Sequence, residues 1–554
     1  MKRAVLAIFG DDAASPRTAA VAAGFGLRDI AHTPGLRLFV GDALPVQRLG
    51  NGTIMVGDHF PGTEAGNGCG WGNYLAFREE GREAVVARAP LTGLPLYWTQ
   101  QGARLICSTH LPPFSAFAGP AGLDWDFVAH ALSFVNLRTE RSGLRERFEL
   151  LAGSELRFDG RAVSVRSFWS PWDHVDRARP QSAADLAPML RDRIVSCTAA
   201  WGGRRRDILL ELSGGLDSSI VAAALAAAKL DYRALTLATS GADGDEREFA
   251  RAVAQRCGVE LIEKIHGDGD VDLVSPLPSP GFRPGAYSVL GGIDRAFEEV
   301  LPGQDISIFG GIGGDNIFAF DGSVAPIIDA FEHFGPGRRA FGVLRDRARA
   351  SGATVWEAAR LAWRARRRGP RCGWRRDVQF LNDTHLPAHP FAHPWDDGAA
   401  RVSQAKRNHV ESLRRILDFL DRPARWQGRD AVAPLLSQPI VEFCLSVPSW
   451  TWFEGGRDRM VARKAFAAQL PPEIVWRRGK GRLESLCAAA YLRQRHALGE
   501  LLLEGRLTAH GLLDRAAIET YLGRDLIDGN FDYFRLIEIA DVERWVRAVE
   551  DASP

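Results

Sequence analysis

Two patterns of apolar and polar residues follow one another along this sequence. In residues 1 to about 168, short apolar segments are separated by turn residues such as Gly50-Asn51-Gly52, which is typical of β-strands joined by turns. The segments predict strands at Ala4–Phe9, Leu36–Val40, Thr53–Val56, Asn73–Phe77, Glu83–Ala87, Pro95–Trp98 and Leu105–Ser108. The first part of the chain is therefore predicted to be rich in β-structure.

After residue 184, apolar runs alternate with segments of helical spacing. Ala184–Ala200 predicts a helix, and a second helix is predicted to begin near Asp245. Continuous apolar runs predict buried strands at Ile208–Leu212, Arg233–Thr239 and Val259–Ile262. This order predicts a parallel sheet with right-handed crossovers, whose ligands bind at the carboxyl ends of the strands.

Two later regions depart from this alternation. Residues 264–291 are rich in Gly and Pro and predict a long loop before a helix near Asp294–Val300. Residues 331–376 predict Arg-rich helices whose arginines form a solvated face, with a patch for nucleic acid or an acidic peptide as the alternative. Prolines separate His385, His389 and His393, so a metal site there is not expected.

Composition sets limits on the class of protein. The 554 residues are 46% hydrophobic and 25% charged with a net charge of +1, which indicates a soluble globular protein and gives no general attraction to nucleic acid or anionic membranes. Seven cysteines without paired spacing indicate reduced thiols, not disulfides or zinc. No apolar run approaches the roughly 18 residues of a membrane-spanning helix. We expect a cytoplasmic protein without membrane or nucleic-acid partners.

One strand runs into a motif that suits phosphate. Ile208–Leu212 is followed by Ser213-Gly214-Gly215-Leu216-Asp217-Ser218-Ser219 and then by small apolar residues with helical spacing. Small residues allow the tight turn, and the free N–H groups of a first helical turn attract an anion. Asp217 would repel that anion, so it makes sense mainly as a magnesium ligand. The alternative is an ordinary strand-to-helix turn.

A second strand repeats this arrangement. Ile306–Phe309 runs into Gly310-Gly311-Ile312-Gly313-Gly314 and ends at Asp315. On adjacent strand ends, Asp217 and Asp315 could together hold Mg²⁺ on a triphosphate, with water completing the octahedron. An aspartate that merely closes a turn is the alternative for Asp315.

The first motif resembles the pyrophosphate loop (PP-loop) of ATP pyrophosphatases, which split ATP into AMP and pyrophosphate. Other segments resemble the asparagine synthetase superfamily, in order along the chain: Val85–Trp98, Glu155–Pro171, Leu436–Pro448 and Gly456–Gly481. The resemblance implies an α/β fold class. Residues 1–172 would form a degenerate α+β amidotransferase sandwich of the Ntn type, and residues 181–554 a PP-loop synthetase domain with a parallel sheet and added helices. Residues 171–180 would link them.

The same resemblance implies ligands and site residues. Those implied to contact ATP are Ser213, Gly214, Gly215, Leu216, Asp217, Ser218, Ser219, Leu237, Gly311 and Lys464. Asp217 and Asp315 match the family's magnesium ligands. Lys480, one of only six lysines, matches a catalytic lysine that faces the adenylate and offsets its negative charge; a surface loop lysine is the alternative.

Two positions depart from the family's pattern. A glutaminase of this kind uses a cysteine directly after the initiator Met, whereas this chain has Lys2, and its first cysteine is Cys69. The N-terminal domain is therefore not expected to release ammonia from glutamine. Ile312 replaces the Glu of asparagine synthetases and the Tyr of β-lactam synthetases, which disfavours both activities.

The remaining resemblance is to lasso peptide macrolactam synthetases (lasso cyclases). It implies that MgATP activates an Asp or Glu side chain of a precursor core peptide, and that the peptide's N-terminal amine then closes an isopeptide ring. A leader peptidase and a leader-binding protein of the same pathway are the expected partners. A synthetase of the β-lactam or carbapenam type, asparagine synthetase-like amidation without glutaminase activity, and a non-catalytic peptide-binding protein remain as alternatives.

Overall fold

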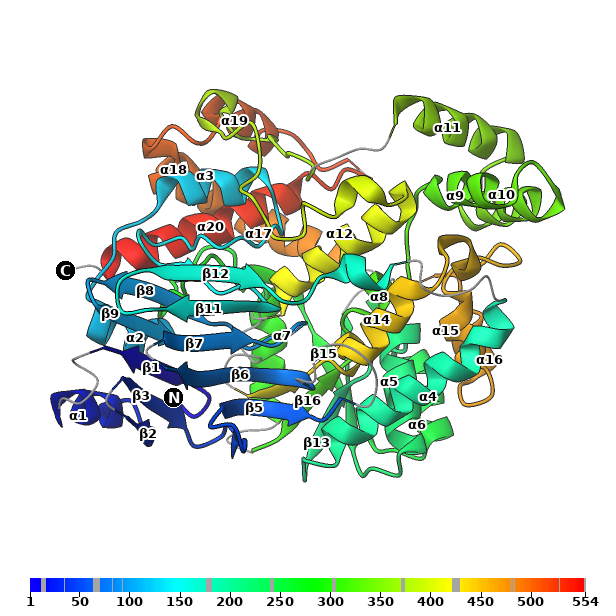
Figure 1. Ribbon diagram of the computed structural model, residues 1–554. Coiled ribbons are helices and arrows are strands. Elements are labelled where there is room, and N and C mark those ends of the chain that lie inside the picture. The colour runs from blue at the N-terminus through cyan, green and yellow to red at the C-terminus, as the bar shows by residue number, and fades with distance from the viewer. Residues whose placement is uncertain are drawn as a thin grey trace.

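A computed structural model describes residues 1–10, 16–33, 35–62, 70–81, 83–91, 93–175, 182–239, 244–300, 305–369, 374–420, 429–479, 481, 484–527 and 529–552. Its N-terminal part is built from two antiparallel sheets (Figure 1). The first has the order β10 (Phe148–Glu149), β8 (Tyr97–Gln101), β9 (Arg104–Ser108), β1 (Val5–Phe9), β3 (Leu36–Gly41) and β2 (Leu27–His32). The second has the order β12 (Val163–Ser167), β11 (Ser154–Phe158), β7 (Glu83–Arg88), β6 (Trp71–Glu80), β5 (Ile54–Phe60) and β4 (Val46–Arg48).

Strand β1 shows why the first sheet is apolar on both faces. Val5 and Phe9 point into the core that the two sheets share with Val56 and Phe77. Leu6 points to the other side, where the first sheet packs on helices of the C-terminal part. Helix α20 (Tyr533–Asp551) is one of these, and α2 (Leu111–Ala118) and α3 (Trp125–Ser133) of the N-terminal part pack on the same side. A strand covered on both faces reads as a continuous apolar run.

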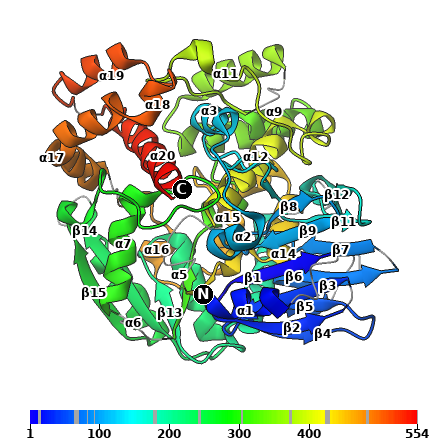
Figure 2. The same ribbon diagram turned by 90° about the vertical axis from the view of Figure 1, so that its left-hand side faces the viewer.

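The C-terminal part contains a five-stranded parallel sheet (Figure 2). Its order is β15 (Leu261–His266), β14 (Arg233–Thr239), β13 (Ile208–Glu211), β16 (Ser307–Gly310) and β17 (Asp430–Val432). Leu209 packs on one face with α7 (Tyr287–Val300). Leu210 packs on the other face with α4 (Ala183–Gly202), α5 (Leu216–Ala227) and α6 (Arg247–Cys257). The α/β fold class expected from the sequence is confirmed.

The C-terminal part contains further helices. They are α8 (Gly314–Ile317), α9 (Ala325–Phe334), α10 (Arg338–Ala350), α11 (Val355–Arg368), α12 (Gln404–Phe419), α14 (Gln438–Ser446), α15 (Met460–Ala465), α16 (Pro472–Val475), α17 (Glu484–Leu503), α18 (Arg506–Ala509) and α19 (Arg515–Leu522); α1 (Pro16–Gly24) lies in the N-terminal part. Among the described helices, none is both long and apolar enough to cross a membrane.

Two predicted regions differ from the structure. The loop expected at residues 264–291 is shorter, because β15 continues to His266 and α7 already begins at Tyr287. The Arg-rich helices expected as far as residue 376 end at Arg368. Gly369 caps this helix with a φ of 75°, a conformation that glycine adopts without strain and that stops the helix.

Buried ion pairs hold the N-terminal sheets against the parallel sheet. Arg205 lies between Asp58 of β5 and Asp430 of β17, with 2.6 Å from its guanidinium to each carboxylate. Trp169 also donates from Nε1 to Glu442 of α14 over 2.8 Å. Because removing one partner would leave a buried charge unpaired, these contacts fix how the two parts meet.

Candidate functional site

The two glycine turns lie side by side at one edge of the parallel sheet. Strands β13 and β16 are neighbours, and Glu211 pairs with Gly310 at their carboxyl ends. A cavity of about 480 Å³ opens there. The predicted residues that line it are Ser213, Gly215, Leu216, Asp217, Ser218, Leu237, Gly311 and Asp315. The topology thus brings most of the predicted nucleotide-binding and metal-binding residues to one place.

Glycines permit the close approach of these turns. A β-carbon at Gly311 would lie 2.4 Å from the backbone nitrogen of Ser218, and one at Gly314 would lie 2.3 Å from Cγ of Asp217. Gly214 has a φ of 72°, and a β-carbon there would also lie 2.6 Å from Cβ of Phe249. Larger residues would therefore push the two turns apart and open the cavity floor.

Serine hydroxyls fix the turn that precedes α5. The Oγ atoms of Ser213 and Ser218 are 3.2 Å apart, and Ser219 donates from Oγ to the carbonyl of Gly215 over 2.7 Å. Ser219 is fully buried, so its hydroxyl shapes the turn without lining the cavity. The residues of the first turn of α5 line the cavity, and first-turn amides have no acceptor inside their own helix. This end of α5 consequently suits a phosphate group.

Arg459, which was not among the residues predicted from the sequence, reaches both candidate magnesium ligands. Its Nη1 lies 3.4 Å from Oδ1 of Asp217 and also donates to Oδ1 of Asp315. Burial alone would lower the pKa of Arg459, but Asp217, Asp315 and Asp458 outweigh burial and raise that pKa above its ordinary value. A permanently charged guanidinium therefore lies between the two carboxylates.

Three more arginines, Arg463, Arg477 and Arg478, line the cavity. Arg477 pairs with Glu246 over 2.7 Å, and its guanidinium carbon lies 3.7 Å from the ring centre of Phe249. These contacts hold Arg477 against the turn at Gly214, whose carbonyl it also reaches at 3.5 Å. Positive charge thus lines the side of the cavity that faces the PP-loop, which favours an anionic ligand.

The two predicted lysines are not seen in the cavity lining. Lys464 does not line the cavity, and its Nζ donates to Glu454 over 2.6 Å instead. Lys480 lies outside the described residues, although Gly479, immediately before it, lines the cavity.

The carboxylate pair fits a nucleotide-bound Mg²⁺. Within the described ranges, no group of three or more His, Cys, Asp or Glu side chains could hold a metal ion. Mg²⁺ nevertheless needs only one or two protein carboxylates when phosphates and water supply the other ligands. Asp217 and Asp315 contact the same nitrogen of Arg459, so they are close enough to share one cation in its place.

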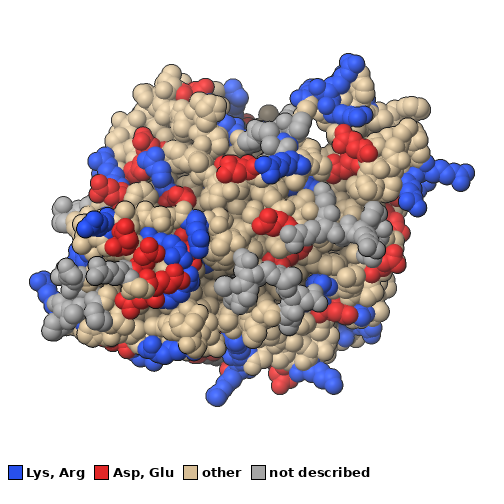
Figure 3. Space-filling model, viewed as in Figure 1, with Lys and Arg blue, Asp and Glu red and all other residues tan. Residues whose placement is uncertain are grey.

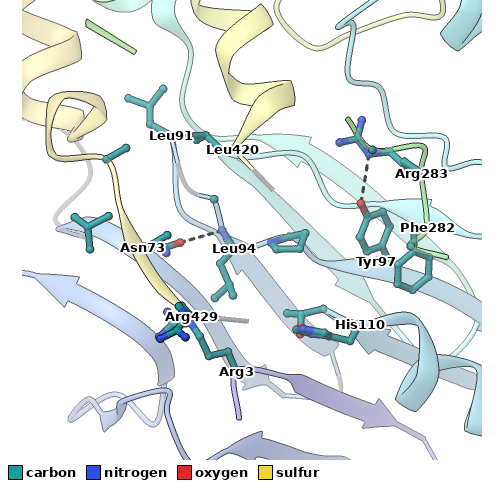
Figure 4. Close-up of a pocket in the computed structure, with 18 of the residues that line it drawn as sticks. Arg3, Asn73, Leu91, Leu94, Tyr97, His110, Phe282, Arg283, Leu420 and Arg429 are labelled. Atoms are coloured by element: carbon teal, nitrogen blue, oxygen red, sulfur yellow. Dashed lines mark hydrogen bonds between the residues drawn. The ribbon is translucent and has the colours of Figure 1, made fainter. Parts of the chain in front are cut away.

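A second cavity, of about 300 Å³, lies between the N-terminal sheets and the parallel-sheet part (Figure 4). Tyr97 and Phe282 stack there with ring centres 3.8 Å apart, and Nε of Arg283 lies 3.4 Å from the Tyr97 hydroxyl. Burial lowers the pKa of His110 to about 4, with the N-terminal amine and Arg3 adding to the effect, so this imidazole is neutral. The described residues that line this cavity include no cysteine and none of the predicted site residues.

One comparison with known proteins covers most of the C-terminal part. A family model described as asparagine synthase matches residues 190–547, which include both glycine turns. No curated protein matches the chain.

Solved structures show only a weak likeness. The allosteric regulatory enzyme of purine biosynthesis is 11% identical over 50% of this chain and 82% of its own, with a TM-score of 0.20. Glutamine phosphoribosylpyrophosphate amidotransferase from B. subtilis is 12% identical over 50% of this chain and 83% of its own, with a TM-score of 0.19.

Proposed function

Because this chain belongs to the asparagine synthase family and is therefore an ATP-dependent, amide-forming ligase, we propose that it closes a macrolactam ring in a peptide. The peptide would be the core of a lasso precursor, with an Asp or Glu side chain as acceptor and the N-terminal amine as attacking group. The observation that carries the ligase chemistry is the pair Asp217 and Asp315 beside the amino end of α5.

ATP would bind with its phosphates against the PP-loop. The first-turn amides of α5 and the hydroxyls of Ser213 and Ser218 would hold phosphate oxygens, while Leu237 and Gly311 border the nucleotide. Asp217 and Asp315 would hold Mg²⁺, which supplies charge neutralisation for the phosphates when it is bound. Arg459 would then leave the carboxylates and face the phosphates. Lys480 would face the α-phosphate, as the family resemblance implies.

The first chemical step would activate the acceptor. A carboxylate oxygen of the peptide attacks the α-phosphorus, the bond from this phosphorus to the bridging oxygen breaks, and pyrophosphate leaves with the electron pair. In the second step the N-terminal amine attacks the acyl carbon, gives up a proton, and AMP departs as the amide forms. The protein's part is to hold amine and acyl carbon in contact and to keep water from the adenylate.

Two features support an amine supplied by the substrate itself. Lys2 follows the initiator Met in this sequence, at the position where a glutaminase of this kind carries its nucleophilic cysteine. At the synthetase cavity, Ile312 presents an apolar side chain where asparagine synthetases, which use ammonia, carry Glu. A leader peptidase and a leader-binding protein would deliver the peptide.

A substrate panel tests this proposal. Purified protein is given MgATP with linear peptides that carry an internal Asp or Glu, with small β-amino acid derivatives, or with aspartate and ammonia. We expect ATP–pyrophosphate exchange and AMP formation only with a peptide, whose product has lost one water and resists aminopeptidase. Exchange that depends on a small derivative or on aspartate would assign the enzyme to another branch of the family. ADP as the product would contradict the PP-loop chemistry itself.

A further inference from the structure

Helix α11 presents an unusual face to solvent. Trp356, Arg360, Trp363 and Arg367 follow one another at intervals of three and four residues, so they share one side of the helix. Trp356 is 84% exposed and Trp363 is 54% exposed. The guanidinium carbon of Arg367 lies 4.1 Å from the ring centre of Trp363. Two large aromatic side chains thus stand in water with arginines between them.

The opposite side of α11 explains how this face is held outward. Ala358 and Ala362 are buried and pack with Ile327 of α9 and Leu344 of α10. Because the alanines face α9 and α10, the Trp and Arg side chains on the other side of α11 point to solvent. Figure 1 shows α9, α10 and α11 at the upper right, at the edge of the molecule farthest from the N-terminal sheets.

The charged residues of this region are mostly positive. Residues 338–368 contain ten arginines and only two acidic residues, Asp346 and Glu357, whereas the whole chain has a net charge of +1. Figure 3 shows blue side chains that project at the upper right, over the end of α11. The positive charge is therefore local and complements an acidic surface.

The helices of this region also contact both chain segments that lead to the synthetase cavity. Arg347 of α10 donates to the carbonyls of Asp321 and Ser323, in the segment that follows α8 and Asp315. On the other side, a β-carbon at Gly456 would lie 2.8 Å from Cβ of Arg349, and Gly456 comes three residues before Arg459. Helix α10, on which α11 packs, is therefore in contact with the segment that follows Asp315 and with the one that precedes Arg459.

We propose that the α11 face formed by Trp356, Arg360, Trp363 and Arg367 is a docking site for a partner polypeptide that carries acidic and apolar side chains in alternation. Trp and Arg are the residues most often found to dominate binding energy in protein interfaces. Acidic groups of the partner would pair with the guanidinium groups, and its apolar side chains would cover the indole rings. Binding at this face requires neither ATP nor the ligase reaction.

Other polyanions fit the face less well. A helix that lies in a membrane surface needs a continuous apolar side, whereas the apolar side of α11 is packed within the protein and its exposed side places arginines between the tryptophans. Nucleic-acid binding draws on charge spread over a wide surface, but this chain as a whole is nearly neutral.

Binding of a labelled peptide tests the proposal. Full-length protein without ATP is titrated into a fluorescein-labelled peptide of Glu-Glu-Leu repeats long enough to span α11, and anisotropy is measured at low and physiological salt. We expect micromolar binding that weakens with salt, and roughly tenfold weaker binding by the double variant Trp356→Ala/Arg360→Ala. The matched control Val355→Ala/Arg366→Ala changes one apolar residue and one arginine on another side of α11 and is expected to stay within about twofold.

Several results would overturn this assignment. The first is that the peptide does not bind, and the second is that both double variants weaken its binding equally. The third is that phosphatidylglycerol vesicles or a labelled single-stranded DNA bind more tightly than the peptide and lose that binding when Trp356 is replaced. Both double variants should keep the thermal unfolding midpoint and peptide-dependent ATP–pyrophosphate exchange of the unaltered protein. If neither the unaltered protein nor the variants catalysed ATP–pyrophosphate exchange, but the labelled peptide still bound, the result would contradict the ligase proposal and not the docking site.

Discussion

A β-carbon on Gly314 would overlap Asp217, with only 2.3 Å between it and the carboxyl carbon. The two residues belong to different turns, at the ends of β16 and β13, and their contact sets the position of the Asp217 carboxylate beside Asp315. The position of the two candidate magnesium ligands therefore depends on a residue without a side chain, Gly314.

Gly314→Ala should consequently impair the ligase reaction. Alanine suits the backbone of α8, so folding is preserved, but the methyl group displaces the Asp217 carboxylate. A displacement of about 1 Å at a reacting site costs on the order of a hundredfold in rate, which is the loss expected for AMP formation. Gly322→Ala is the control, because a β-carbon there meets nothing within 4 Å. Equal rates in the two variants would show that this contact does not position the carboxylate.

Asp217→Asn and Asp315→Asn should each abolish most of the AMP formation. An amide keeps the shape of the side chain but removes the negative charge that holds Mg²⁺ on the phosphates, so a loss of roughly a hundredfold or more is expected. The measurement is AMP release at several Mg²⁺ concentrations, with higher concentrations restoring part of the rate. Asp192→Asn, at an exposed position on α4, is the control. A variant with full activity would remove its residue from the site.

Arg459→Gln should make the free protein respond to Mg²⁺. Without the guanidinium, Asp217 and Asp315 repel each other, and a cation that binds between them stabilises the folded state. We expect Mg²⁺ without ATP to raise the unfolding midpoint of this variant by about 2 °C or more, and to leave the unaltered protein unchanged. Arg457→Gln serves as control, since Arg457 donates to the carbonyl of Trp476 instead. A Mg²⁺ effect of the same size in all three proteins would contradict this role of Arg459.

The turns could be predicted from the sequence because their signals are local. A buried apolar strand, glycines and an acidic residue stand next to one another at Ile208–Asp217 and at Ile306–Asp315, and strand alternation then places the two ends together. Most strands were predicted within two or three residues for the same reason. The end of α11 also had a local signal, Gly369-Pro370, that the helical pattern of the arginines obscured.

Arg459 could not be predicted in this way. It meets Asp217 across 242 positions of sequence, and nothing in the neighbourhood of either residue encodes that distance. Strand β17 was missed because three residues are too few for a pattern, although they extend the sheet beside β16. The position of Arg459 and the pairing of β17 both depend on contacts that form only in the assembled fold. Most helices and strands, in contrast, follow from local propensity.

His409 should make stability depend on pH. This buried side chain of α12 lies with Nε2 2.9 Å from the carbonyl of Ile317, at the end of the helix that carries Asp315. Burial, with Lys406 nearby, lowers the pKa of His409 from 6.5 to about 3. Below pH 6.5 the unfolded chain binds a proton that the folded protein does not, so stability falls as the pH falls through about 6.5 toward 3. At about pH 5.5 this one group should lower the free energy of unfolding by about 1.4 kcal/mol relative to neutral or higher pH.

His409→Gln isolates that contribution, because the glutamine amide can still donate to Ile317 but does not titrate in this range. Urea unfolding at about pH 8 and about pH 5.5 should show a pH difference that is about 1.4 kcal/mol smaller in the variant than in the unaltered protein. His110 and His130, whose pKa values are each lowered to about 4, destabilise both proteins equally in acid and cancel in this comparison. His496→Gln, at an exposed position on α17, should keep the full pH dependence. If His409→Gln also kept the full pH dependence, the pKa of His409 would not be lowered in the folded protein. The imidazole would then be protonated there at about pH 5.5 while it donates to the carbonyl of Ile317.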